Sequence, residues 1–453
     1  MTNIRSRMLL CSFIFVLLIV TVRSVPSGGV TAAPEPTSTD HPKPSEGTVI
    51  ATYILPAIPL GPFQNAVLPN SVANDRKLQV GSIGSDMWHG PNDPPNEFWL
   101  VSDRGPNGQG TVGGQRRRTF LMPEFSPVIL RVQTQGDTIN VLQSIPILTQ
   151  SGKPVTGLPN TDGRDEVPYD ASAQTRLHYN PNGLDIEGLV RTSAGDFWLC
   201  EEYSPSIVHV DQTGKVLKRY IPEGLILDGV DYPFTPVLPA IYATRKSNRG
   251  FEGMTISPDE KTLYLVLQSP LYNPDKKTGD ASRHTRVLVF DIASEKPVAE
   301  YVYRFEAIKD FAEDPKLGPD EMKLSAVALV NATTLLIVER TDTVAKLYSV
   351  DISKATNILG SRWDDAATTP SLEALDDLGA SSIAVLPKLP VADLSKLSGV
   401  PDKVEGLVVL DQTAVAIVSD NDFDIGKFDE NGDNVGEGVK TKIVVIGLPK
   451  PLP

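Results

Sequence analysis

The sequence predicts an all-β fold, a β-propeller, from three observations. A Glu-Gly pair or a related pair recurs along the chain, an apolar β-type run follows each copy, and the copies recur at intervals of about 65 to 105 residues. Further β-type runs follow in most copies, so each unit has room for four short strands joined by long loops. This is the sequence pattern of propeller blades.

The repeat is clearest in three copies, which begin with Glu187-Gly188, Glu252-Gly253 and Glu405-Gly406. A fourth copy has Ser325-Ala326 at this place, and a more divergent copy near the amino terminus begins at 81–84. The apolar runs that follow end in polar residues and lie at 98–104, 197–202, 263–268, 335–340 and 415–420. Five blade-like units are therefore recognisable.

The two ends of the predicted domain indicate how the ring closes. The β-type segments 48–55 and 442–448 have no other partners, and their pairing in one blade would remove an exposed sheet edge. A sixth blade remains open for the long segment 146–179. Two β-sandwiches are the alternative architecture, but sandwich strands give no reason for Glu-Gly to recur at the start of one strand.

The amino terminus predicts export. Arg5 and Arg7 precede an apolar run from Met8 to Val22, and small residues suited to cleavage follow between 24 and 33. The run is shorter than the roughly 20 residues that a membrane-spanning helix needs. We expect a signal peptide at 1–33, a Pro/Ser/Thr-rich linker at 34–47 and one folded domain at 48–450, in a secreted or periplasmic protein with no stable membrane span after cleavage.

Composition excludes several classes of site and partner. The net charge of -14 argues against nucleic acid as a partner. Cys200 is the one cysteine after the predicted signal, which rules out an intrachain disulfide, and its apolar strand indicates a small buried side chain. The five histidines form no pair at ligand spacing, so a zinc centre is not expected. No Gly-x-Ser-x-Gly or phosphate-binding loop motif is present. The sequence does not indicate an oligomeric state.

Acidic residues are expected to meet at the axis. The innermost strand of each blade lines the central channel of a propeller, so Glu187, Glu252 and Glu405 would converge there. The ends of the following strands supply a second acidic set, which consists of Asp103, Glu201, Glu202, Glu339 and Asp420. Like charges this close need a cation, and oxygen ligands favour Ca²⁺, with Mg²⁺ as the alternative.

A structural alternative exists for the Glu-Gly pairs. The Glu could accept backbone hydrogen bonds from the neighbouring blade, and the Gly could allow close packing at the crowded axis. This structural alternative does not explain the second acidic set. Ser325 stands where a fourth Glu would be expected, so this unit either adds nothing to the site or leaves room for substrate.

Arginines lie beside the acids. Arg104 follows Asp103, Arg249 precedes the Glu252 copy, and Arg340 ends its own apolar run. Guanidinium groups match phosphate and carboxylate geometry, so Arg104 and Arg249 are candidates for offsetting charge in catalysis. For a small anionic ester substrate, the predicted binding residues are Arg104, Arg249, Arg340 and Asn421.

The combination of motifs resembles a known family. The segments at 185–189, 197–199, 249–259 and 418–423 are together similar to the phytase-like family described as having esterase-like activity, and the likeness spans roughly 48–447. The resemblance implies an exported propeller with recurring Glu and Asp residues and a phosphoesterase role. Its characteristic acids correspond to Glu187, Glu252, Glu405 and Asp420. Ser325 departs from the pattern and argues against a symmetric site.

The sequence is consistent with three functions. The first is metal-assisted hydrolysis of a phosphoester, with the metal held by Glu187, Glu252 and Glu405. The second is hydrolysis of a carboxylic ester or lactone on a calcium propeller. The third is a non-catalytic binding propeller whose acids hold a structural ion. Substrate spectra separate the first two, and substitution of Glu252 by Gln separates both from the third.

Overall fold

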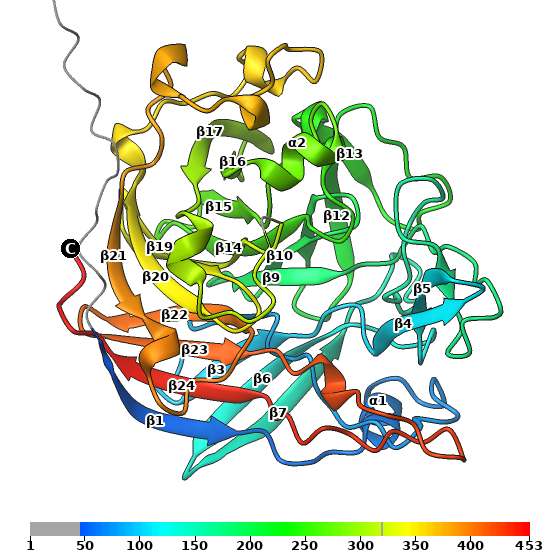
Figure 1. Cartoon of the computed structure of the whole chain (residues 1–453). Helices are drawn as coiled ribbons and strands as arrows, with labels where there is room; N and C mark the ends of the chain where they lie inside the picture. Colours follow the sequence, from blue (N-terminus) through cyan, green and yellow to red (C-terminus); the bar gives the residue numbers. More distant parts are fainter. Residues whose placement is uncertain (1–45, 319) are drawn as a thin grey trace, which may run out of the picture. The chain divides into compact units, whose positions relative to one another are not determined.

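The computed structural model describes residues 46–453 except residue 319, and this part of the chain is mostly β (Figure 1). The predicted signal peptide and nearly all of the predicted linker lie outside the described residues. Among the residues described, no helix has the length and apolar character required to cross a membrane. The first strand, β1, begins at Thr48.

The strands form several sheets. One sheet contains β9 (Ile186–Arg191), β10 (Phe197–Glu201), β11 (Ser206–Val210), β12 (Val216–Pro222) and β13 (Phe234–Leu238). The next contains β14 (Phe251–Ile256), β15 (Thr262–Leu267), β16 (His284–Asp291) and β17 (Lys296–Arg304). A third contains β18 (Lys323–Asn331), β19 (Thr334–Arg340), β20 (Ala345–Asp351) and β21 (Lys388–Asp393).

An eight-stranded sheet joins the two ends of the described chain. Its order is β2 (Asp86–Trp88), β3 (Glu97–Val101), β6 (Val128–Gln135), β7 (Thr138–Pro146), β1 (Thr48–Ile54), β24 (Lys442–Gly447), β23 (Ala414–Ser419) and β22 (Val404–Asp411). Its two halves meet where β1 pairs with β7 through Ile54 and Thr138 alone. We therefore count β2-β3-β6-β7 and β22-β23-β24-β1 as two separate four-stranded units.

The remaining elements are short. A three-stranded sheet contains β4 (Asn107–Val112), β5 (Gln115–Phe120) and β8 (Pro168–Tyr169). The α-helices are α1 (Leu60–Val67) and α2 (Lys276–Ala281). The 3₁₀ helices are η1 (Ala240–Thr244), η2 (Ile308–Phe311), η3 (Ile352–Lys354), η4 (Arg362–Asp364), η5 (Leu372–Ala374), η6 (Gly379–Ser381), η7 (Leu394–Lys396) and η8 (Asp422–Asp424).

The first strands of the five units contact one another in a closed ring. β9 contacts β2 and β14, β18 contacts β14 and β22, and β22 contacts β2. Five units of strands therefore surround one axis, and each presents its first strand to it. The segment 146–179, which was left open as a sixth blade, contributes only the two-residue β8 to the small sheet, so it forms no further four-stranded unit.

The amino-terminal strand completes the last unit. β1 pairs antiparallel with β24, from Thr48 opposite Gly447 to Ile54 opposite Lys442. Figure 1 shows the blue β1 beside the red β24. This is the predicted pairing of the two terminal strands, and it covers the edge that β24 would otherwise expose.

The glycines of the repeated pairs allow the ring to pack tightly. A Cβ atom on any of them would come too close to the backbone of the next inner strand. The added Cβ would lie 3.1 Å from Met254 N at position 188, 2.9 Å from Ala326 Cα at position 253 and 2.8 Å from Met87 N at position 406. The structural explanation for Gly is thus confirmed by these contacts. It leaves the preceding Glu unexplained.

Apolar side chains fill the space between successive sheets. One cluster joins Trp198 and Tyr220 of the β9–β13 sheet to Met254, Leu265 and Phe290 of the next. Cys200 is free and buried in the same cluster, as its sequence context predicted. Burial of apolar surface between sheets is therefore the main source of stability.

Candidate functional site

The repeated residue of each inner strand is the extra residue of a β-bulge. In β9, Gly188 pairs with Cys200 and Ile186 pairs with Glu201, so Glu187 has no partner residue in β10. The same skip occurs at Glu252 in β14, Ser325 in β18 and Glu405 in β22. A bulge re-aims the side chain of its extra residue, and bulges are common beside functional sites. The bulge accounts for the repeat in the sequence and for the position of the acids.

The three bulge carboxylates influence one another electrostatically. Burial, and then the charge of Glu252, raises the pKa of Glu187 well above its usual value. Burial, and then the charge of Glu405, raises the pKa of Glu252 to about 7. The structure therefore brings Glu187, Glu252 and Glu405 together.

A metal-sized group of carboxylates lies on one side of this cluster. Asp185, Glu187 and Glu202 each offer an oxygen atom, and these atoms lie within 4.8 Å of one another. The backbone N–H of Glu202 donates to the carbonyl of Asp185 at 3.0 Å, which fixes the two residues side by side. Sequence reasoning missed Asp185. Its position two residues before Glu187, directly before β9, was the available signal.

Glu202 is the least compensated member of the group. It is 1 % exposed, and neither carboxylate oxygen accepts a hydrogen bond from a donor among the described residues. Burial, and then the neighbouring Glu252 carboxylate, raises its pKa well above the usual value. A buried carboxylate without donors is costly unless it takes up a proton or a cation.

Arg104 supplies the positive charge nearest to this group. Its Nη1 lies 3.3 Å from an oxygen of Asp185 and 3.3 Å from one of Glu166, and it also bonds Asn248. Its backbone N–H donates to the other oxygen of Asp185 at 3.1 Å. One guanidinium is thus shared among several acids, and it orients Asp185 rather than neutralising the whole group.

The Ser325 unit makes the ring of acids asymmetric. Arg340 donates from Nε to the hydroxyl of Ser325 at 2.5 Å and from Nη2 to the carboxylate of Glu405. The small side chain at 325 thus leaves space for a guanidinium. Glu405 is also near Lys403 and Lys323, whose charges oppose the effect of burial on its pKa. The Glu405 side of the cluster therefore has three cations close to it, whereas the Glu202 side has the shared guanidinium of Arg104.

A cationic group borders the acids on the Glu405 side. Lys323 donates to Asp342 at 2.5 Å, and its pKa is lowered to about 8 by burial and then by the charges of Arg340 and Arg249. Arg249 donates to the hydroxyl of Ser269 at 2.9 Å. Sequence reasoning named Arg249 and Arg340 but missed Lys323, which has no motif of its own.

Asp103 and Asp420 lie together at a further point of the cluster. Burial, and then the negative charge of Asp420, raises the pKa of Asp103 well above its usual value. Burial, and then the negative charge of Glu405, does the same to Asp420. Asn421, a predicted substrate ligand, uses its amide group within the chain. Its amide oxygen accepts from Ser82 N at 2.9 Å, and its amide nitrogen donates to Val439 O at 3.1 Å. These bonds hold the loop, and a role of Asn421 in substrate binding stays a prediction.

Two predicted acids of the second set are held in ion pairs within their own units. Glu339 accepts from Tyr303 at 2.5 Å and from Lys388 at 2.6 Å. Glu201 pairs with the fully buried Arg219 at 2.7 Å. Glu201 is the last residue of β10, whereas Glu202 lies in the turn that follows it, and the two carboxylates have separate partners. The carboxylates of Glu339 and Glu201 are therefore already paired with cations of the chain.

The fold and the site thus define a class of protein. It is a mostly β chain in which five units of strands surround one axis, with a largely buried acidic cluster at the starts of the inner strands. The model of the phytase-like family, described as "Esterase-like activity of phytase", matches residues 80–423, and the chain belongs to this family.

A curated relative is 25% identical over an alignment of 315 positions, which covers 60% of this chain and 61% of the relative. It is an uncharacterized secreted protein of Arthroderma benhamiae. The chain thus spans less than two thirds of that relative's length.

Solved structures with similar folds include two enzymes. Luciferin-regenerating enzyme is 10% identical, with 82% of this chain and 94% of that chain covered at a TM-score of 0.32. The PQQ-bound aldose sugar dehydrogenase of Streptomyces coelicolor is 9% identical, with 82% and 97% covered at a TM-score of 0.31. Scores this low carry no argument about function.

Proposed function

We propose that this chain is an exported five-bladed β-propeller that hydrolyses a phosphoester with the help of a divalent cation held by Asp185, Glu187 and Glu202. The observation that carries the proposal is Glu202, which is buried, receives no hydrogen bond and lies within reach of two other carboxylates. The family description and the secreted relative support the reaction class and the location.

The donor set fits a hard cation. All three groups are carboxylates, which favours Ca²⁺, or Mg²⁺, over metals that prefer nitrogen or sulfur ligands. The fit rests on the uncompensated oxygens of Glu202, because Asp185 already has the guanidinium of Arg104 nearby. When bound, such a cation polarises a phosphoryl oxygen and favours ionisation of water.

The chain's own residues supply the other functions. Arg249 and Lys323 present positive charge beside the acids and would bind the anionic oxygens of the substrate. Glu252, whose pKa is raised to about 7, is suited to accept a proton from an attacking water near neutral pH. Arg104 holds the carboxylate of Asp185 in a fixed orientation.

A carboxylic ester or lactone is the second candidate substrate, since the family description speaks of esterase-like activity. A binding propeller with a structural ion is the third candidate. All three share the same acids, so only turnover separates them.

The test is hydrolysis of a phosphomonoester, a phosphodiester, phytate and a carboxyl ester by purified protein, with Ca²⁺, with Mg²⁺ and with chelator. Phosphate release that chelator removes, and that Glu202→Gln loses while the exposed control Glu124→Gln retains it, is the expected result. Carboxyl-ester turnover alone would favour the second candidate. No turnover of any ester, with stabilisation by metal, would favour the third.

A further inference from the structure

A motif that the proposed chemistry does not use lies on the hairpin turn between β18 and β19. Asn331, Ala332 and Thr333 form an Asn-x-Thr sequence, and no other asparagine of the chain is followed two residues later by Ser or Thr. This is the acceptor motif for N-linked glycosylation of exported proteins. Three-residue motifs also occur by chance, so the position of the motif in the fold is the relevant evidence.

The whole motif is exposed to solvent. Asn331, Ala332 and Thr333 are all exposed, and the next residue, Thr334, is buried. Asn331 is the last residue of β18 and pairs with Thr334, the first residue of β19, so the motif forms the turn itself. Exposed turns tolerate bulky additions because few contacts have to be displaced. A glycan on this turn therefore extends into solvent and leaves the strands in place.

The two ends of the Asn331 amide have separate roles in the turn. Its Oδ1 accepts from the backbone N–H groups of Thr333 and Thr334, at 3.1 Å in both cases, and these bonds hold the turn. Its Nδ2 donates to the carbonyl of the exposed Pro453 at 3.2 Å. An N-linked glycan is attached through Nδ2, which keeps one N–H, and leaves Oδ1 free. The turn therefore keeps its hydrogen bonds when the side chain is modified.

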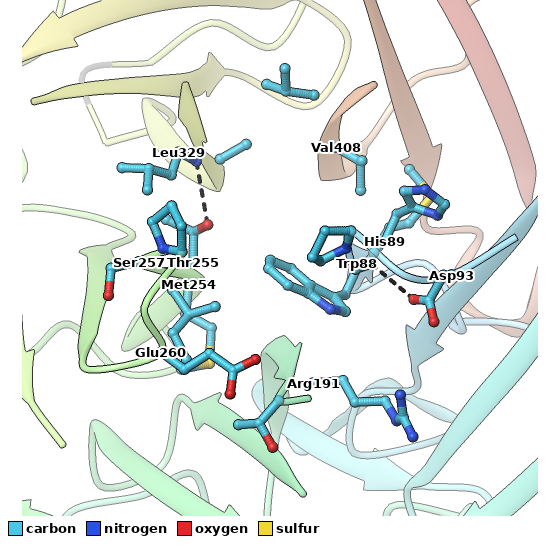
Figure 2. Close-up of a pocket in the computed structure, with 18 of the residues that line it drawn as sticks. Trp88, His89, Asp93, Arg191, Met254, Thr255, Ser257, Glu260, Leu329 and Val408 are labelled. Atoms are coloured by element: carbon cyan, nitrogen blue, oxygen red, sulfur yellow. Dashed lines mark hydrogen bonds between the residues drawn. The ribbon is translucent and has the colours of Figure 1, made fainter. Parts of the chain in front are cut away.

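The turn lies at the end of β18 that is farther from the acids. The bulge residue Ser325 and Asn331 are the third and last residues of β18, about 20 Å apart along an extended strand. Leu329, two residues before Asn331, lines a cavity of about 260 Å³ to which all five inner strands contribute. Figure 2 shows Leu329 at this cavity, where its backbone N–H donates to Thr255 at 3.3 Å. A glycan on Asn331 would therefore lie towards the cavity end of the ring and away from the acidic cluster.

We propose that Asn331 carries an N-linked glycan. The inference rests on the export part of the proposed function and is independent of the hydrolysis. The secreted relative comes from Arthroderma benhamiae, a fungus, and fungal export passes through a compartment that glycosylates Asn-x-Thr motifs. The predicted signal peptide would bring the turn into such a compartment.

The co-reactant is an oligosaccharide joined through its C1 atom to the diphosphate of a lipid carrier. A bond forms between Nδ2 of Asn331 and C1 as the bond between C1 and the phosphate oxygen breaks. The diphosphate leaves with the electron pair of the broken bond, and the amide nitrogen loses one proton. No oxidation or reduction takes place.

The test is expression of the full chain in insect cells, with mass spectrometry of the exported protein before and after enzymatic release of N-glycans. We expect a loss of mass on release and conversion of this one asparagine to aspartate. Asn331→Asp keeps Oδ1 for the turn and should lose the glycan. Thr333→Ala should also lose it, whereas Thr333→Ser keeps the hydroxyl and should be glycosylated. The control is Asn431→Asp, at an exposed asparagine outside the motif, which should be glycosylated like the parent.

The outcomes separate this inference from the proposed function. An exported chain without a glycan, or an N-glycan that persists in both Asn331→Asp and Thr333→Ala, would overturn the inference and leave export standing. A chain confined to the cytosol would contradict export and this inference with it. Ester hydrolysis by the glycosylated and the deglycosylated chain should be equal, and its absence from both would count against the proposed reaction alone.

Discussion

The guanidinium of Arg340 pairs with the carboxylate of Glu405, which belongs to the neighbouring unit of the ring. The unit that lacks its own bulge carboxylate therefore neutralises that of the next unit. Ser325 makes this arrangement possible, since its hydroxyl accepts from the same guanidinium. The departure from the repeat leaves uncompensated negative charge concentrated near Glu202.

Arg340→Met should destabilise the fold by about 3 kcal/mol, because removal of one partner leaves a largely buried carboxylate unpaired. Urea denaturation measures this change. The double variant Arg340→Met/Glu405→Gln should recover part of the loss. If the single and double variants were equally unstable, the pairing would not be the cause.

Without metal, stability should fall as pH rises from about 4.5 to 7. The pKa of Glu252 is about 7 in the folded chain, above the ordinary value of a Glu carboxyl, so the folded state holds a proton that the unfolded state releases first. The stabilisation from this group is fully present below the ordinary pKa of a Glu carboxyl. It is lost as the pH rises through the pKa of Glu252 in the folded chain. Melting temperatures at pH 5 and pH 8 with chelator test this, and a higher melting temperature at pH 8 would contradict it.

Glu339→Gln should lower the free energy of unfolding by about 2 to 4 kcal/mol, since Lys388 and Tyr303 lose a buried charged partner. The stabilisation produced by added Ca²⁺ should stay at the parent's value, because Glu339 lies in a separate ion pair. Thermal denaturation with and without Ca²⁺ measures both effects. Loss of the Ca²⁺ effect would return Glu339 to the metal site.

Lys323→Met should raise KM for a phosphoester about tenfold with a smaller change in kcat, because a cation that binds the anionic ground state is removed. Steady-state kinetics at pH 7 are the measurement. Lys215→Met, at an isolated β-bridge directly before β12, is the matched control. An unchanged KM would remove Lys323 from the substrate site.

The sequence was sufficient to predict the ring and the convergence of the acids, because Glu187, Glu252 and Glu405 repeat at the same place in successive units. It was not sufficient to separate Glu202 from Glu201. That distinction depends on where β10 ends, because Glu201 is its last residue and Glu202 lies in the turn that follows. A sequence pattern does not fix the end of a strand to one residue.

The cationic side of the site was predicted only in part, because the sequence marks Arg249 and Arg340 beside the acids but does not mark Lys323. Arg340 and Lys323 approach Glu405 only because the sheets are placed around one axis, and nothing near them in the sequence marks that contact. The cavity that the inner strands line towards their other ends was likewise not predicted, because its wall combines side chains from five strands whose repeated motif marks only the acids.

The most direct test of the account is calorimetric titration of the chelator-treated chain with Ca²⁺ at pH 7.5. We predict one site, with protons released on binding, because burial raises the pKa values of Glu187 and Glu202 and a bound cation displaces any proton that these carboxylates hold. Glu202→Gln should abolish binding, and Glu124→Gln should leave it unchanged. Equal Ca²⁺ binding by the parent and Glu202→Gln, or no binding of Ca²⁺ or Mg²⁺ by the parent, would contradict the central claim that these buried carboxylates hold a divalent cation.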